Sequence, residues 1–127
     1  QHVLEPLSGY LLLGLKLYND PQSFCGSWNF GPNTSEFKNV HNVASEIIKN
    51  MKKGTIEIAT NPDTQHEANL LQLNCDKASQ LLNWSPRWSV NKTIEETAKW
   101  YRYFLEGKDV REVSLNQIND YFEGELN

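Results

Sequence analysis

The chain has 127 residues, which is enough for one compact domain with a single core. Its 22% charged and 39% hydrophobic residues are ordinary for a folded globular protein and argue against extensive disorder. The formal net charge is −4 and no basic run is present, which argues against a nucleic-acid binder because such proteins need clustered cations. The sequence therefore predicts one domain over residues 1–127.

The apolar stretches are short. The longest, residues 11–15, is far below the roughly 20 residues that a helix needs to cross a bilayer, and no signal-peptide pattern precedes it. Because the chain starts at Gln1 and not at a Met, we expect it to be a piece of a longer gene product. Cys25 and Cys75 form neither a CxxC pair nor a disulfide framework, so we expect free thiols in a cytoplasmic protein that contacts no membrane.

Three elements are predicted in the first half of the chain. Apolar residues at helical spacing predict a helix over roughly 4–18, which is apolar on several sides and therefore buried. Residues 27–30 predict a short strand. Residues 40–51 give the clearest helical pattern, with Asn39 as a cap and Gly54 just past the end.

The second half is predicted to hold two more short strands and three helices. Alternation over 55–59 and an apolar run at 70–73 predict the strands. Asn74 caps a short helix, and helices follow over about 91–106 and 114–123. The residues expected to face inward are Ile94, Ala98, Tyr101 and Leu105 in the first of these two and Leu115, Ile118 and Phe122 in the second.

The fold class is therefore a helix-dominated α/β domain with two or three short strands. So few short strands make a poor independent sheet. We expect the domain to lean on a larger neighbour. In the isolated chain, the apolar face around residues 11–15 is then exposed and prone to association.

Most catalytic signatures are absent from the sequence. There is no GxGxxG or GxxxxGK[ST] loop, no GxSxG and no Tyr-x-x-x-Lys pair. His66-Glu67 begins like a zinc motif, but the second His is missing, and the remaining His and Cys residues are scattered. We therefore expect no metal site, no cofactor-binding site and no catalytic residue in this chain.

Residues 28–32 are one candidate binding segment, because aromatic residues are followed there directly by Gly31. An exposed ring beside a glycine that permits close backbone approach suits stacking on a flat base. The alternative is that Trp28 and Phe30 belong to the core and that Gly31 only makes a turn. Composition alone favours this alternative.

The second such stretch is the polar cluster at residues 64–68, which precedes an apolar run. Glu67 can accept hydrogen bonds from a ribose diol, and His66 can donate to a phosphate or a hydroxyl. The alternative is a solvated loop, and spacing alone favours it.

Nearly the whole chain resembles the C-terminal part of CDP-glucose 4,6-dehydratases, which are extended short-chain dehydrogenase/reductase (SDR) enzymes. Residues 1–11 resemble the family segment that follows an Arg-Pro-Trp, and this block points to the CDP-glucose branch. The other similar blocks follow in family order: Trp28-Asn29-Phe30-Gly31-Pro32, His66-Glu67-Ala68, Leu82-Asn83-Trp84-Ser85-Pro86 and Thr97-Ala98-Lys99-Trp100-Tyr101.

This resemblance implies an enzyme of two parts. An N-terminal Rossmann domain, absent from this chain, binds NAD and carries the acid and base residues. The C-terminal part, present here, holds the nucleotide end of the substrate. The family converts CDP-glucose to CDP-4-keto-6-deoxyglucose, a step toward the deoxysugars of bacterial lipopolysaccharide O-antigen. We expect the isolated chain to be inactive, and the complete enzyme to be a homo-oligomer whose substrate is a CDP-sugar.

The resemblance assigns substrate binding to five residues of this chain: Glu67 and His66 beside the nucleotide, Phe30 and Gly31 near the base or ribose, and His2 at the border of the phosphate region. The glutamate role is carried over from the related GDP-mannose dehydratases. Asn74 stands where the family generally has Asp. Either residue can cap the following helix.

Two alternatives to the CDP-glucose enzyme stay open. One is another nucleotide-sugar enzyme of the same superfamily, either a GDP- or dTDP-sugar dehydratase or a 4-epimerase. The other is a non-enzymatic protein-interaction domain whose aromatic helices form the contact surface. Nucleotide affinity separates the two classes, because the interaction domain predicts none.

Overall fold

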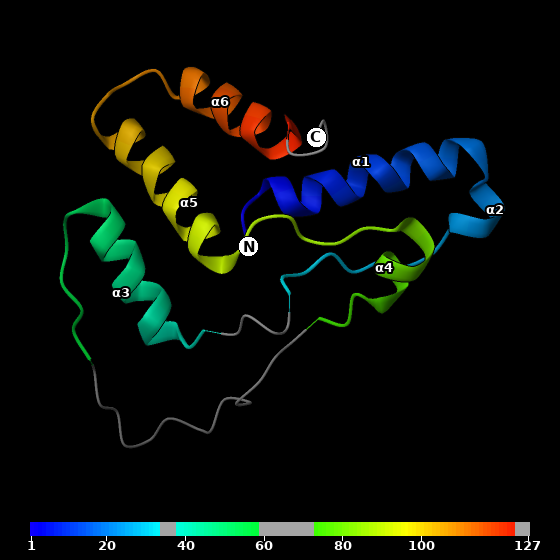
Figure 1. Cartoon of the computed structure of the whole chain (residues 1–127), viewed down its shortest axis with the longest axis horizontal. Helices are drawn as coiled ribbons and strands as arrows, with labels where there is room; N and C mark the ends of the chain where they lie inside the picture. Colours follow the sequence, from blue (N-terminus) through cyan, green and yellow to red (C-terminus); the bar gives the residue numbers. More distant parts are fainter. Residues whose placement is uncertain (34–37, 59–72, 124–127) are drawn as a thin grey trace.

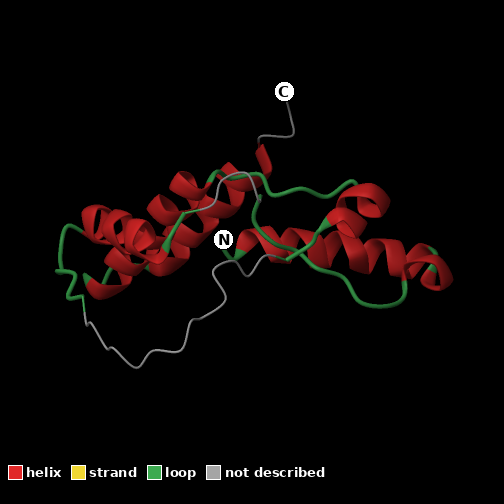
Figure 2. Cartoon of the chain, turned by 90° about the horizontal axis from the view of Figure 1, so that it is seen from below, coloured by secondary structure: helices red, strands yellow, loops and turns green. Residues whose placement is uncertain are grey.

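The computed structural model describes residues 1–33, 38–58 and 73–123, and six helices lie within them (Figure 1). In chain order they are α1 (Leu4–Asn19), α2 (Pro21–Phe24), α3 (Val40–Met51), α4 (Asp76–Leu82), α5 (Val90–Leu105) and α6 (Val110–Glu123). They form two groups, with α3 and α6 packed against α5 at one end and α2 and α4 against α1 at the other (Figures 1 and 2). α1 starts beside the first group and runs out to the second.

The predicted helices are confirmed. For α3 and α5, local capping interactions explain where the helices begin or end. The Asn39 side chain accepts a hydrogen bond from the backbone N–H of Asn42 at 2.8 Å, so α3 begins directly after it. α3 ends before Lys52, which is left-handed with φ 55°. The Ser89 hydroxyl accepts from the N–H of Lys92 at 3.2 Å and starts α5 in the same way.

The predicted strands at 27–30 and 55–58 are wrong, since the described part of the chain contains no strand. The backbone near residues 27–31 is satisfied by side chains instead of by a neighbouring strand. These bonds are Lys77 Nζ to the Ser27 carbonyl (3.0 Å), Gln1 Nε2 to the Phe30 carbonyl (3.0 Å) and the Gly31 N–H to Cys75 Sγ (3.1 Å). Residues 59 and 70–72, the rest of the predicted strands, lie outside the described residues.

The predicted inward face of the last helix is wrong for two of its three residues, whereas the third, Phe122, is half-buried and contacts Tyr121. α6 begins at Val110, and Leu115 and Ile118 are exposed. Its buried residues are Val113, Gln117 and Tyr121. Polar partners on other elements determine which side of α6 faces inward. Two of its three buried residues, Gln117 and Tyr121, bury a hydrogen-bonding group. On α5 the prediction holds for half its members: Ile94 and Ala98 are buried, whereas Tyr101 and Leu105 are exposed.

The α1 end of the molecule has a small apolar core made by Phe30, Ala78, Leu82 and Trp84. α1 packs on this core along one side only, so the expectation that it is buried is wrong: Tyr18 is 86% exposed. The expected exposure of the apolar face around residues 11–15 is confirmed at Leu11 and Leu15, which are 70% and 58% exposed.

A buried carboxylate connects α1 to the other end of the molecule. Glu5 is 1% exposed and accepts hydrogen bonds from the backbone N–H of Arg87 and of Trp88 at 3.0 and 2.8 Å. The Arg87 bond is to Oε2, which also accepts from the Tyr121 hydroxyl at 2.7 Å, and the Trp88 bond is to Oε1. Three donors satisfy the buried charge, and they fix α1 against both the 84–88 segment and α6.

Candidate functional site

A cavity of about 510 Å³ lies where residues 31–33 meet residues 73–76 and 84–86. We call it the Gly31 cavity. Its lining residues are Gly31, Pro32, Asn33, Leu73, Asn74, Cys75, Asp76, Ser79, Trp84, Ser85 and Pro86. This volume lies within the range of sites that hold small molecules and cofactors.

Close backbone approach at Gly31 shapes this cavity. A Cβ atom at Gly31 would lie 3.2 Å from both Cys75 Sγ and Leu73 Cβ, which is tighter than ordinary contact. The Gly31 N–H donates to Cys75 Sγ at 3.1 Å. The glycine of the 28–32 stretch thus brings two segments together that are 44 residues apart in sequence.

Asn74 holds the turn on the far wall of the cavity. Its Oδ1 accepts from the N–H of Asp76 and its Nδ2 donates to the Asp76 carboxylate, both at 2.9 Å. The side chain therefore orders the start of α4 as the sequence predicts, although the residue that directly precedes the helix is Cys75. The substitution of the usual Asp is accommodated here, because the amide supplies both an acceptor and a donor.

The described residues that line the Gly31 cavity supply acceptors and hydroxyls but no cation. Asp76 supplies a carboxylate, Ser79 and Ser85 supply hydroxyls, and neither Lys nor Arg is among the lining residues. A sugar diol or the edge of a base can hydrogen-bond to such groups. A diphosphate needs cationic donors from elsewhere.

The aromatic residues of the 28–32 stretch do not present open rings. Phe30 is 6% exposed and its ring meets that of Trp84 edge-on, with centroids 5.0 Å apart. Trp28 is stacked on Phe24 and covered by Lys77, whose Nζ lies 4.1 Å from the ring centroid. Both rings therefore pack as the alternative in the sequence analysis describes, and a contact of Phe30 with a nucleotide stays a prediction.

His2 lines a different cavity, of about 540 Å³, between the start of α1 and helices α5 and α6. We call it the His2 cavity. The ring is 5% exposed and packs on Trp88 with centroids 4.8 Å apart. Burial lowers the pKa of His2, although the charges of Glu96 and Glu5 oppose the shift. The imidazole is therefore neutral at pH 7, and its place at a phosphate border stays a prediction.

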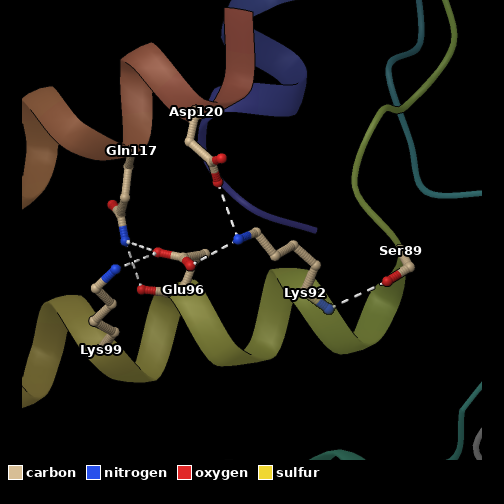
Figure 3. A network of polar contacts seen from close by, with 6 residues as sticks. All are labelled: Ser89, Lys92, Glu96, Lys99, Gln117 and Asp120. Atoms are coloured by element: carbon tan, nitrogen blue, oxygen red, sulfur yellow. Dashed lines mark hydrogen bonds and ion pairs between the residues drawn. The ribbon is translucent and has the colours of Figure 1, made fainter. Parts of the chain in front are cut away.

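Beside this cavity a network of charged groups joins α5 to α6 (Figure 3). Glu96, 4% exposed, accepts from Lys92 at 3.0 Å, from Lys99 at 3.4 Å and from the Gln117 amide. Lys92 also pairs with Asp120 at 3.0 Å. Burial would raise the pKa of the Glu96 carboxyl, but the hydrogen bonds of Lys92 and Gln117 and the two lysine charges outweigh it and the pKa is lowered.

The chain was compared with known proteins. No family model matches it. Over 121 residues it is 35% identical to the CDP-glucose 4,6-dehydratase of Salmonella typhimurium, and the match covers 95% of this chain. The predicted resemblance is confirmed. The chain spans about one third of the length of that dehydratase (34%), which is consistent with the expected C-terminal part.

The residues predicted to bind substrate are only partly brought together. Gln1 Nε2 donates to the Phe30 carbonyl at 3.0 Å, so the start of the chain and the 28–32 stretch are neighbours. Gly31 and His2, however, line different cavities. Glu67 and His66 lie outside the described residues. The role of all five in binding the dehydratase substrate stays a prediction.

Four residues that line the Gly31 cavity were not predicted as site residues from sequence: Cys75, Asp76, Ser79 and Ser85. Ser85 lies in one of the blocks that resemble the dehydratase family, so that signal was available. Cys75 and Ser79 carry no local signal, because they become neighbours of Gly31 only through the packing of α4.

The described residues do not fit NAD. A dinucleotide's phosphates need a glycine-rich loop at the start of a helix, but Val3, Asn39 and Ser89 precede α1, α3 and α5. Within residues 1–33, 38–58 and 73–123, no three His, Cys, Asp or Glu side chains gather as a metal site would require. None of the helices in the same ranges combines the length and apolar character that crossing a membrane requires.

Proposed function

We propose that the chain is the substrate-binding part of an NAD-dependent CDP-glucose 4,6-dehydratase, a lyase that forms CDP-4-keto-6-deoxyglucose. The observation that carries this proposal is the 35% identity over 95% of the chain. A cavity of suitable size supports it, at a stretch that resembles a family block. In the complete enzyme the NAD would be held by a Rossmann domain outside this chain. We further propose a cytoplasmic homo-oligomer.

In this proposal the Gly31 cavity receives the uncharged end of the nucleotide. Its carboxylate and hydroxyls match a ribose diol or the edge of a base. Neither Lys nor Arg is among the described residues of its lining, which disfavours the phosphates. Gly31 and the backbone of Phe30 would lie along the substrate, with Glu67 and His66 completing the contacts. His2 lines a separate cavity, so its predicted place at the phosphate border is not part of this proposal.

The chain would contribute by orientation. NAD supplies hydride acceptance and return when it is bound to the complete enzyme. The residues of this chain bind the nucleotide, exclude water from its base, and hold the hexose where the reacting atoms meet. None of them is assigned a proton transfer, so we expect negligible turnover of CDP-glucose by this chain with added NAD.

Calorimetric titration of the chain with CDP, GDP, UDP and dTDP tests the proposal. We expect CDP to bind most tightly. Preference for another nucleotide would replace the CDP-glucose assignment with another nucleotide-sugar enzyme. Absence of binding by all four would favour a protein-interaction domain.

A pair of variants on α4 locates the site. Ser79 is exposed and lines the Gly31 cavity, whereas Gln80 is exposed and does not. Ser79→Phe fills the cavity and should weaken CDP binding at least tenfold, and Gln80→Phe should leave it unchanged. Equal affinities in the two variants would show that the nucleotide binds elsewhere.

A further inference from the structure

The His2 cavity holds two buried polar side chains whose hydrogen-bonding capacity is only half used. It shares no lining residue with the Gly31 cavity. Its lining residues are Gln1, His2, Val3, Leu4, Leu7, Thr97, Trp100, Tyr101, Ser114, Gln117 and Ile118.

The first of the two side chains is Gln117, which is 4% exposed. Its amide nitrogen donates to the Glu96 backbone carbonyl at 2.8 Å and to the Glu96 carboxylate at 3.1 Å. Both partners are acceptors only, so the nitrogen must face Glu96 and the amide oxygen must face away from it. Figure 3 shows this orientation. No described residue donates a hydrogen bond to that oxygen.

The second is His2, which is 5% exposed. Its Nδ1 accepts from the backbone N–H of Leu4 at 3.3 Å, and a nitrogen that accepts cannot carry the proton of a neutral imidazole. The proton is therefore on Nε2. Among the described residues, no acceptor pairs with this Nε2–H.

These two atoms are open to a ligand. In the part of the chain that the structure describes, no side-chain nitrogen or oxygen is both buried and without a partner. The unpaired Nε2–H and Oε1 are therefore accessible, and their residues line the His2 cavity. The residues that carry this donor and this acceptor, each more than nine-tenths buried, line the same cavity.

The remaining lining selects for a flat and uncharged molecule. Trp100 and Tyr101 supply aromatic walls, and Leu4, Leu7 and Ile118 supply aliphatic ones. None of the described lining residues is Lys, Arg, Asp or Glu, and Gln1 brings only the α-amino group at the start of the chain. Most of the wall therefore offers a charged ligand no counter-charge for the hydration that it loses. A ring amide has apolar faces and carries an N–H and a C=O on one edge.

We propose that the His2 cavity binds a neutral, flat ring that carries an amide, with its carbonyl accepting from His2 Nε2–H and its N–H donating to Gln117 Oε1. This proposal does not depend on the dehydratase assignment, because it stands on the two side chains and the cavity.

Two simple probes test the hydrogen bonds in the unmodified chain. 2-Pyridone carries the ring amide, and in N-methyl-2-pyridone a methyl group replaces the hydrogen of the amide N–H. We expect 2-pyridone to bind in the millimolar range. We expect the methylated probe to bind about three- to tenfold more weakly, because Gln117 Oε1 is desolvated without a donor. In ¹H–¹⁵N spectra of the imidazole, 2-pyridone should shift the His2 Nε2–H signal and slow its exchange with water.

A variant pair confirms the location. Leu7 and Leu15 lie on the same helix and are 43% and 58% exposed, but only Leu7 lines the cavity. Leu7→Trp should abolish 2-pyridone binding and Leu15→Trp should not. If Leu7→Trp does not fold, the comparison of 2-pyridone with N-methyl-2-pyridone in the unmodified chain still tests the two proposed hydrogen bonds.

Three results would overturn the proposal: no binding of 2-pyridone, equal affinity for the two probes, or tighter binding of methyl glucoside, which would indicate a sugar site. None of these affects the CDP titration, so the two proposals can fail separately. Conversely, Ser79→Phe should leave 2-pyridone binding unchanged even where it removes CDP binding.

Discussion

The substitution Glu5→Gln is expected to lower the free energy of unfolding by about 2 kcal/mol, because it weakens a buried connection between α1 and α6. The carboxylate accepts from the N–H groups of Arg87 and Trp88 and from the Tyr121 hydroxyl. A hydrogen bond to a charged group contributes about 1.5–3 kcal/mol and a neutral one about 0.5–1.5 kcal/mol. The amide keeps one acceptor oxygen. With that oxygen in the place of Oε1, the Trp88 bond becomes neutral and the Arg87 N–H keeps only its longer 3.2 Å contact. The –NH2 then stands in the place of Oε2, so the Tyr121 hydroxyl must accept instead of donate.

Urea denaturation followed by tryptophan fluorescence measures this change. Glu95→Gln is the matched control, since Glu95 is exposed on α5, and its effect should stay within about 0.5 kcal/mol. Glu5→Ala removes every acceptor and should cost about 3–5 kcal/mol. The double variant with Tyr121→Phe should be more stable than additivity predicts by at least about 0.5 kcal/mol. Equal stabilities of Glu5→Gln and Glu95→Gln would refute the assignment of Glu5 as a buried connection.

Three further predictions concern packing and pH. A Cβ atom at Gly9 would lie 2.3 Å from the Phe30 ring, so Gly9→Ala should lower the free energy of unfolding by about 1–3 kcal/mol. At Gly14 a Cβ atom meets nothing within 4 Å, so Gly14→Ala should raise it by about 0.5–1 kcal/mol. Changes of the same sign for both variants in urea denaturation would contradict the packing. Burial raises the pKa of Tyr121 to about 12, so the unfolded chain loses this proton first, and the free energy of unfolding should fall by on the order of 2 kcal/mol between about pH 10 and 12. Absorbance at the phenolate band checks this, and Tyr121→Phe should remove the late titration; a fall in stability that survives this variant would count against Tyr121. Because the pKa of Glu96 is lowered in the folded chain, its carboxylate stabilises the fold at pH values above the unfolded pKa of about 4.3, and this contribution is lost as the pH falls through the folded pKa. Glu96→Gln should therefore flatten that part of a plot of stability against pH. An unchanged plot would contradict the ion-pair network.

The helices could be predicted from sequence because their ends depend on neighbours within a few residues. Asn39 and Ser89 cap helices through hydrogen bonds to the residue three positions later. The inward face of α6 could not be predicted in this way. Tyr121 is buried because its hydroxyl meets Glu5, 116 residues earlier in the chain, and Gln117 because its amide meets Glu96. Apolar periodicity carries no information on such partners.

The strand predictions were wrong for a related reason. A β-branched or aromatic run predicts an extended segment, but a strand also needs a neighbouring backbone. The backbone of the 27–31 segment bonds to side chains instead, including those of Lys77 and Cys75. For the candidate site, sequence singled out Gly31 as a glycine that permits close backbone approach, and the atoms that approach it within the protein belong to Cys75 and Leu73. The approach of a nucleotide base stays a prediction. Sequence did not show that the approaching group is Cys75, whereas the core position of Phe30, which composition favoured, is confirmed.

The start of α1 is the structural feature common to both cavities. His2, just before the helix, lines one of them, and Glu5 in the first turn fixes the helix against Trp88, on which the His2 ring packs. One turn later, Gly9 lets the Phe30 ring approach, and Phe30 precedes the glycine of the other cavity. Because both cavities depend on one rigid helix, loosening it through Glu5→Gln should weaken the binding of CDP and of 2-pyridone together. The cavity-filling variants Ser79→Phe and Leu7→Trp should each affect only one ligand. If Glu5→Gln affected neither ligand while it destabilised the fold as expected, the two cavities would be positioned by elements other than α1.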